Sequence, residues 1–198
     1  MVDRSTGKAA IFLSVGLALA ASLLLAPEYP FAKDYYGYGL RVTARIAFVF
    51  FMLAYLARPM VSVLGQGQWL VLHRCYLGLA AAIAHTVHFA YIVLYFQETG
   101  EEIELITIIF GGLAFVLFWF MSLTSNRLSQ RVLGAWWGHL HTFGMHWIWI
   151  IFFQSWLGTA FVIPWYWVFV ALSVFGLGLR IAAFVKKAPV CARGGMRT

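Results

Sequence analysis

Long apolar runs separated by short polar breaks fill most of the chain. The six runs cover residues 9–26, 39–57, 70–96, 105–123, 132–156 and 164–185. Each is close to or above the ~20 residues that a helix needs to cross a ~30 Å hydrocarbon core. Membrane-spanning strands would alternate apolar and polar residues, whereas these runs are apolar throughout. The pattern predicts an all-α polytopic membrane protein, in which residues 1–198 form a single bundle of six transmembrane helices.

The breaks between the runs support this division. Pro27 and Pro30 follow the first run, Gly65 and Gly67 separate the second run from the third, and Pro164 opens the sixth. The first run begins close to the N-terminus, but no convincing small-residue cleavage site follows it. We therefore expect the first run to be retained as a membrane span.

Composition favours a membrane domain and leaves no room for a soluble catalytic one. Of the 198 residues, 63% are hydrophobic and only 11% are charged, against roughly half and about a quarter in soluble domains. No Gly-x-Gly-x-x-Gly segment follows a strand, so no dinucleotide-binding motif is visible. The formal charge of +7 comes mainly from cations beside the apolar runs. Such placement is a signal of membrane topology, and it argues against nucleic acid as a partner.

The charge distribution predicts how the chain is oriented. If both termini share one side, that side collects most of the cations, and the loop before the fourth run on the other side is acidic. By the positive-inside rule, both termini are then cytoplasmic, and Trp165, Tyr166 and Trp167 lie at the outer interface. The cations on the cytoplasmic side are Lys8, Arg58, Arg74, Arg127, Arg131, Lys186, Lys187, Arg193 and Arg197, and the acidic loop holds Glu98, Glu101, Glu102 and Glu104.

Histidines are concentrated in two runs. His73, His85 and His88 lie in the third run, and His139, His141 and His146 lie in the fifth. Ionisable side chains inside a membrane are costly and usually face the bundle interior or a functional path. Imidazole is a common axial ligand of haem iron, and helical bundles draw cofactor ligands from facing helices. This pattern favours haem between the third and fifth helices, and the alternatives are helix–helix hydrogen bonds, bound water, and proton or metal-ion transport.

Spacing adds two further expectations. His73 and His88 are 15 residues apart, or ~22 Å along a helix, which suits two haems with one near each membrane face. Arg41 and Arg45 lie on one face of the second helix, towards its outer end. These arginines either extend to the interface or pair with haem propionates.

Motifs in three of the six runs resemble the ferric reductase-like transmembrane domain. Residues 73–79 read HRCYLGL and residues 85–91 read HTVHFAY, similar to that family's arginine, Leu-Gly-Leu and downstream histidine pattern. Residues 123–126 (LTSN) resemble its loop before the fifth helix, and residues 133–141 (LGAWWGHLH) resemble its Leu-Gly, Trp and Leu-His sequence. Size and layout most resemble the haem-binding membrane subunit of bacterial periplasmic methionine-sulfoxide reductase systems.

The resemblance implies b-type haem, one or two per chain, and electron transfer across the membrane. His88 and His141 match the family's ligand positions best. His73 resembles the inner ligand on the third helix of family members that carry two haems. We therefore expect His73 and His141 to hold an inner haem, with His139 as the alternative to His141, and His88 to hold an outer haem.

The outer site departs from the family's pattern at one position. The second histidine of the fifth helix falls 13 residues after His141 in the family, where this chain has Gln154. His146 and His85 are then the candidates to complete the ligand set beside His88. The number of haems, one or two, depends on this position.

These expectations describe an electron-transfer subunit of an oxidoreductase in a bacterial inner membrane. Its partners would be membrane lipid, a cytoplasmic flavoprotein or quinol as electron donor, and a periplasmic redox acceptor. Flavin or quinone are conceivable further cofactors, although no motif indicates either. The competing hypothesis is a haem-free transporter or proton-conducting protein that uses its intramembrane histidines.

Overall fold

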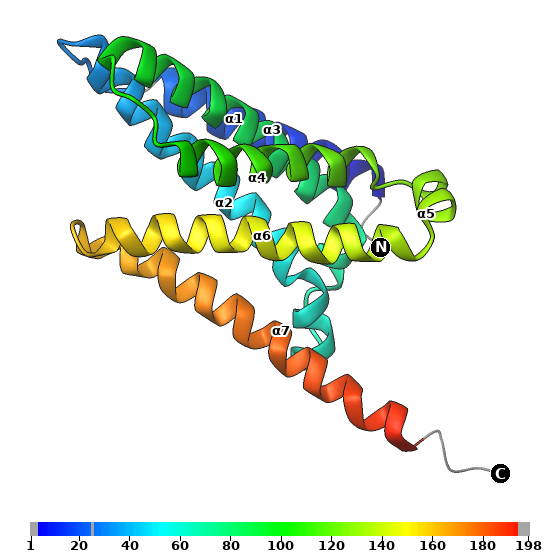
Figure 1. Cartoon of the computed structure of the whole chain (residues 1–198). Helices are drawn as coiled ribbons and strands as arrows, with labels where there is room; N and C mark the ends of the chain where they lie inside the picture. The colour runs from blue at the N-terminus through cyan, green and yellow to red at the C-terminus, as the bar shows by residue number, and fades with distance from the viewer. Residues whose placement is uncertain (1–3, 25, 194–198) are drawn as a thin grey trace.

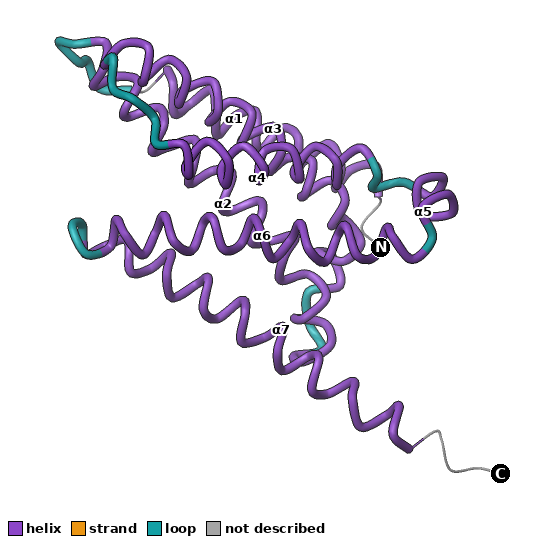
Figure 2. Tube along the Cα trace, in the orientation of Figure 1, coloured by secondary structure: helices purple, strands orange, loops and turns teal. Residues whose placement is uncertain are grey.

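Long helices joined by short turns make up the described part of the chain (Figure 1). The computed structural model describes the backbone of residues 4–24 and 26–193 and the side chains of residues 6–24 and 26–186. All regular structure in these ranges is helical (Figure 2), which confirms the all-α prediction. In chain order the elements are α1 (Arg4–Leu24), α2 (Ala32–Leu64), α3 (Gln68–Thr99), α4 (Leu105–Leu123), α5 (Arg127–Leu133), α6 (Ala135–Ala160), the short 3₁₀ helix η1 (Pro164–Tyr166) and α7 (Trp167–Arg193).

Five helices within the described residues are long and apolar enough to cross a membrane, namely α1, α2, α3, α4 and α7. The chain is therefore a multi-pass membrane protein, whose exposed apolar side chains suit contact with lipid. α6 has 26 residues and covers most of the fifth predicted run. It is not among the five, because three histidines and polar residues such as Gln154 lower its mean hydropathy. A sixth span at α6 stays a prediction.

Helix positions follow the predicted runs, and most helices extend beyond them at one or both ends. α4 covers Leu105–Leu123, as predicted, whereas α2 begins at Ala32 instead of residue 39. α3 likewise continues to Thr99. The turns added before residue 39 in α2 and after residue 96 in α3 carry charged and tyrosine side chains, so the apolar run there marks only the part of the helix that suits hydrocarbon. Backbone hydrogen bonding continues the helix beyond that part.

Two glycines form the tight turn between α2 and α3. Gly65 ends α2 with φ of 70°, and its N–H donates to the carbonyl of Val61 at 3.1 Å. Gly67 begins α3 with φ of 87°. Both backbones lie in the left-handed region that glycine adopts at no steric cost. The predicted break between the second and third runs is thereby confirmed.

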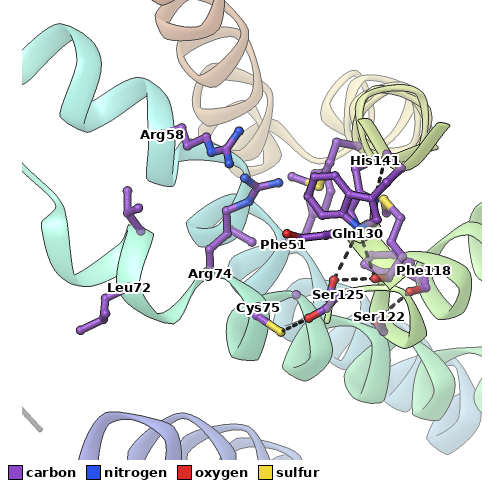
Figure 3. Close-up of a pocket in the computed structure, with 16 residues that line it drawn as sticks. Phe51, Arg58, Leu72, Arg74, Cys75, Phe118, Ser122, Ser125, Gln130 and His141 are labelled. Atoms are coloured by element: carbon purple, nitrogen blue, oxygen red, sulfur yellow. Dashed lines mark hydrogen bonds between the residues drawn. The ribbon is translucent and has the colours of Figure 1, made fainter. Parts of the chain in front are cut away.

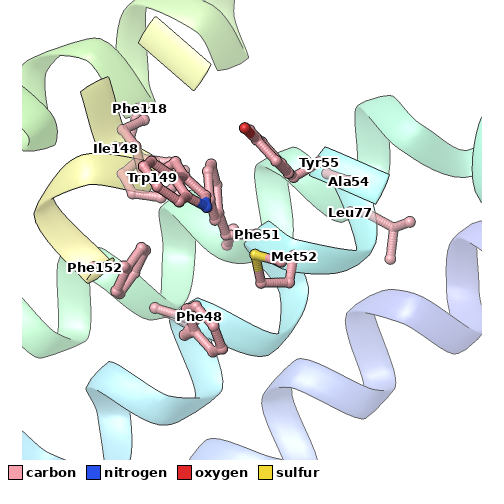
Figure 4. Packing of buried hydrophobic residues seen from close by; sticks show 14 of the residues in the cluster. Phe48, Phe51, Met52, Ala54, Tyr55, Leu77, Phe118, Ile148, Trp149 and Phe152 are labelled. Atoms are coloured by element: carbon pink, nitrogen blue, oxygen red, sulfur yellow. The ribbon is translucent and has the colours of Figure 1, made fainter. Parts of the chain in front are cut away.

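An aromatic cluster packs α2 against α4, α6 and α7 (Figure 4). The ring of Phe48 lies 5.4 Å from that of Phe152 and 5.5 Å from those of Trp156 and Phe169. Phe51 continues the cluster towards α4. α3 contributes small buried residues between its neighbours, and small side chains let helices approach closely in a membrane protein. These residues are Ala80, Ala81, Ala82 and Ala84.

The helix ends form one basic end and one acidic end. At the basic end, Lys186 of α7 donates to the carbonyl of Ser62 in α2 at 2.8 Å, and the ammonium of Lys8 in α1 lies 5.4 Å from the ring centroid of Tyr76 in α3. At the acidic end are the α1–α2 and α3–α4 connections. The predicted segregation of charge is therefore present, and the membrane side that each end faces stays a prediction. The side chains of Lys187, Arg193 and Arg197 lie outside the described residues.

Candidate functional site

Three histidines share one pattern of hydrogen bonding. The Nδ1 atom lies 2.9 Å from the carbonyl oxygen of Trp69 in His73, 3.0 Å from that of Leu40 in His88, and 3.0 Å from that of Trp137 in His141. A carbonyl oxygen only accepts, so these contacts are hydrogen bonds when Nδ1 carries the proton. In the neutral ring, Nε2 then has a free lone pair. Metal-bound histidines typically hold their other ring nitrogen in this way.

His141 lies on α6 and is buried, with 7% of its surface exposed. Its ring stacks on Trp137 at a centroid distance of 4.1 Å. Its Nε2 lies 3.2 Å from the carbonyl of Met121 and 3.4 Å from the hydroxyl of Ser125, which itself donates to the Met121 carbonyl. Either neutral tautomer therefore leaves one ring nitrogen facing a carbonyl oxygen without a proton. An axial bond from Nε2 to iron would require the Met121 carbonyl and the Ser125 hydroxyl to move away from the ring.

His73 is fully buried, and its Nε2 has no hydrogen-bond partner. The ring packs on Trp69 at 4.6 Å, and a Cβ added at Gly7 of α1 would overlap it. His73 thus faces α1, whereas the cavities beside His141 are lined from α3 by other residues. The structure does not bring His73 and His141 together.

His85 and His88 form a pair on α3, with ring centroids 5.4 Å apart. The ring of His85 packs against Phe118 of α4 at 4.9 Å and Phe152 of α6 at 6.2 Å, and its Nδ1 is buried without a partner. Gln154, the position of the family's second α6 histidine, is exposed. The residue that α6 presents to this pair is therefore an aromatic ring instead of a histidine.

Of the remaining candidates, His146 lines one cavity together with His141, whereas His139 and the two arginines line neither of the two cavities. His146 is half-buried, with Nδ1 3.3 Å from the hydroxyl of Tyr55. His139 is exposed and packs edge-on against Trp136. Arg41 is also exposed.

Arg45 is held by the turn between α6 and α7. Its Nη2 donates to the hydroxyl of Tyr166 at 2.5 Å, and its guanidinium lies 4.6 Å from the ring centroid of Trp165. Both contacts are made with η1, so Arg45 lies at the level where the chain turns back. This arrangement resembles the interfacial role that the sequence suggested more than contact with a cofactor in the bundle.

Two adjoining cavities open beside His141 at the basic end. The first, of ≈ 280 Å³, lies between α2, α3, α4 and α6 (Figure 3), and the second, of ≈ 550 Å³, lies between α2, α6 and α7. The second falls within the range of small-molecule sites, about 300–1,000 Å³. Five residues line both cavities: Arg58, Arg74, Trp137, His141 and Met145.

The sequence assigned Arg58 and Arg74 to membrane topology, and Arg74 also to the family-like motif, but it placed neither at a cavity. Arg58 of α2, Arg74 of α3 and Arg180 of α7 converge on the second cavity. Cys75 lines the first and donates its thiol to the carbonyl of Ser125 at 3.3 Å. The signal for this cluster in the sequence was that three different helices each carry an arginine at the same end. Helix rotation decides which of these side chains turn inward, and the run of apolar residues does not fix that rotation.

The donor set suits an axial ligand better than a metal ion held by several side chains. Among the described residues, no three His, Cys, Asp or Glu side chains gather as a metal site. Haem iron needs only one or two protein ligands, because the porphyrin supplies the other four. No protein-family model matches the chain. No solved structure matches it either.

Proposed function

We propose that this chain is a b-type haem protein of the membrane that transfers electrons to a periplasmic acceptor or partner reductase. The observation that carries the proposal is the Nδ1 contact with a backbone carbonyl that His73, His88 and His141 share. These are the three positions that the resemblance to the ferric reductase-like transmembrane domain selects as ligands. A hydrogen bond at Nδ1 fixes the tautomer and the ring orientation that an Nε2 ligand needs.

His141 is the axial ligand that the surroundings support best. Its ring lies in the wall of both cavities, and the carbonyl and ring of Trp137 set its orientation. Phe51, Phe118 and Met145 line the first cavity and would limit access of water. Bound haem supplies the one-electron chemistry, while the side chains set its ligation, burial and orientation.

The proposal includes one haem at His141 as its minimum. His88, with His85 beside it, remains the candidate for a second haem. This second site would need a ligand from outside α3, because Phe152 is the α6 side chain that packs on His85. His73 would require α1 to move before its Nε2 could bind a ligand.

The wider assignment follows from topology and from the family resemblance. We place both termini in the cytoplasm of a bacterium, with α6 as the sixth span of the inner membrane, because cations gather at one end. A flavoprotein or quinol at that side would donate electrons, and a periplasmic redox protein would accept them. The chain would act as an electron-transfer subunit, because the family resemblance implies transfer of electrons across the membrane.

A dithionite-reduced minus oxidised absorption spectrum of the purified chain tests the proposal, with haem counted as its pyridine haemochrome. We expect b-type bands and at least one haem per chain. His141→Ala should abolish haem bound at that site, while His139→Ala should retain it. His139 is the matched control because it is also a histidine of α6, two residues away and exposed.

Two results would contradict the proposal. Unchanged bands and haem content in His141→Ala would show that His141 is not an axial ligand. A colourless protein, even after growth with ample haem precursor, would instead favour the haem-free transporter or proton-conducting hypothesis.

A further inference from the structure

The second cavity gathers positive charge without a counter-ion from the chain. Arg58, Arg74 and Arg180 line it, and no aspartate or glutamate is among its described lining residues. Lys186 adds a fourth cation at the edge, where it donates to the carbonyl of Ser62. Like charges that share a partly buried cavity repel one another, and water screens them less there than at a free surface.

The chain's acidic residues lie too far away to balance these cations. Six of the seven are found in residues 28–34 and 98–104, at the acidic end. The seventh, Asp3, lies outside the described residues. α2 has 33 residues between the two ends, which is ~50 Å of helix. Neutralisation of the cavity therefore calls for an anion from outside the described chain.

The arginines are arranged to receive such an anion. Arg180 is held in place because its Nη2 lies 3.3 Å from the carbonyl of Tyr55 and its guanidinium lies 3.9 Å from the centre of that ring. Figure 3 shows the guanidinium groups of Arg58 and Arg74 close together beside the first cavity, which these two residues also line. Planar guanidinium groups bind phosphate through paired hydrogen bonds.

The part of the wall that α7 contributes is apolar apart from Arg180, and it is open towards lipid. Leu177, Ile181 and Phe184 of α7 line the cavity, and Ile181 and Phe184 are 56% and 76% exposed. A small hydrophilic anion would leave this apolar surface uncovered. An anion that carries hydrocarbon chains would bury it.

We propose that this cavity binds the headgroup of an acidic phospholipid, with its phosphate among the three arginines and its acyl chains along α7. Basic pockets between helices at the cytoplasmic side of a membrane are suited to such headgroups. The inference goes beyond the proposed electron transfer and does not rest on it. It concerns Arg58, Arg74 and Arg180, none of which is assigned to haem ligation, although Arg58 and Arg74 share the lining of both cavities with His141.

Native mass spectrometry of the full-length chain in detergent tests the proposal, with phosphatidylglycerol or phosphatidylcholine added at equal concentration. We expect the first phosphatidylglycerol to bind more tightly than phosphatidylcholine. The double substitution Arg58→Gln and Arg74→Gln should weaken phosphatidylglycerol binding by roughly 30-fold, since each arginine contributes about a factor of five. The matched control is Arg127→Gln with Arg131→Gln, because both residues are exposed, lie on α5 and line neither cavity.

A charge-preserving variant guards against a folding defect. Arg58→Lys with Arg74→Lys should retain most of the preference for phosphatidylglycerol. Equal binding of the two lipids by the native chain would overturn the proposal, and so would equal weakening by the α5 control. Complete displacement of the lipid by an equal concentration of inorganic phosphate would also overturn it, because the acyl chains would then contribute nothing.

Haem content measured on the same variants shows whether the arginines bind the lipid phosphate or the carboxylates of haem. We expect the double glutamine variant to keep its haem while it loses the lipid preference. Loss of haem without any lipid preference in the native chain would assign the arginines to haem carboxylates and overturn the proposal. A native chain without haem that still selects phosphatidylglycerol would contradict only the electron-transfer proposal.

Discussion

Tyr166→Phe removes one oxygen atom from a buried contact between the α6–α7 turn and α2. Tyr166 is 1% exposed, and its hydroxyl accepts a hydrogen bond from Nη2 of Arg45. The ring packs against Trp156 at 5.5 Å and Phe169 at 5.7 Å. Phenylalanine can keep these ring contacts, so the substitution isolates the hydrogen bond.

The structure sets the magnitude of the effect. A hydrogen bond to a charged group contributes about 1.5–3 kcal/mol. Nε of Arg45 already lacks a partner, so the variant leaves a second guanidinium nitrogen unsatisfied. The contact of Arg45 with the ring of Trp165 remains and contributes about 0.5–2 kcal/mol. We therefore expect the free energy of unfolding to fall by about 1.5–3 kcal/mol.

Unfolding in mixed detergent micelles with increasing dodecyl sulfate measures this loss. A double-mutant cycle with Arg45→Gln should give a coupling energy of similar size, because both single variants break the same bond. Tyr38→Phe is the control, since Tyr38 is half-buried and packs on Tyr29. A coupling energy below about 0.5 kcal/mol would refute the reasoning. Loss of haem from Tyr166→Phe, with stability unchanged, would instead indicate that Arg45 pairs with a haem propionate.

Two further substitutions and one labelling experiment test other contacts. Gly7→Val places a side chain on the ring of His73, and we expect thermal unfolding to show a loss of about 1–3 kcal/mol or more from overpacking. Phe48→Ala removes the centre of the aromatic cluster; the same unfolding assay should show a loss of about 2–4 kcal/mol, below the value for a soluble core because lipid solvates part of the exposed surface. In a Cys191→Ser background, Cys75 should react with a maleimide, and haem loading should slow this labelling because Cys75 lines the first cavity.

The sequence pattern predicted most of the fold. The apolar runs located five helices that can span a membrane, and the breaks at Gly65 and Gly67 fixed the α2–α3 turn. Boundaries were less accurate, since α2 starts at Ala32, before its apolar run. Hydrocarbon length determines the apolar run, whereas local backbone hydrogen bonding determines where a helix ends.

The candidate site was predicted only in part. The sequence placed the histidines on α3 and α6, and their residue type pointed to axial ligation. It paired His73 with His141. In the structure, His73 faces α1, whereas His141 of α6 lines the two cavities. The sequence also assigned Arg58 and Arg74 to topology, whereas the structure gathers them with Arg180 at one cavity.

Sequence alone determined that this chain is helical, that it suits a lipid bilayer and that its charges lie at opposite ends. These properties follow from the order of residues along each helix, because hydrophobicity and charge act on each segment separately. Only the tertiary structure decided that His73 faces α1, that His141 borders two cavities and that Tyr166 holds Arg45. Such contacts depend on the rotation and offset of one helix against another, which the packing of all the side chains sets together.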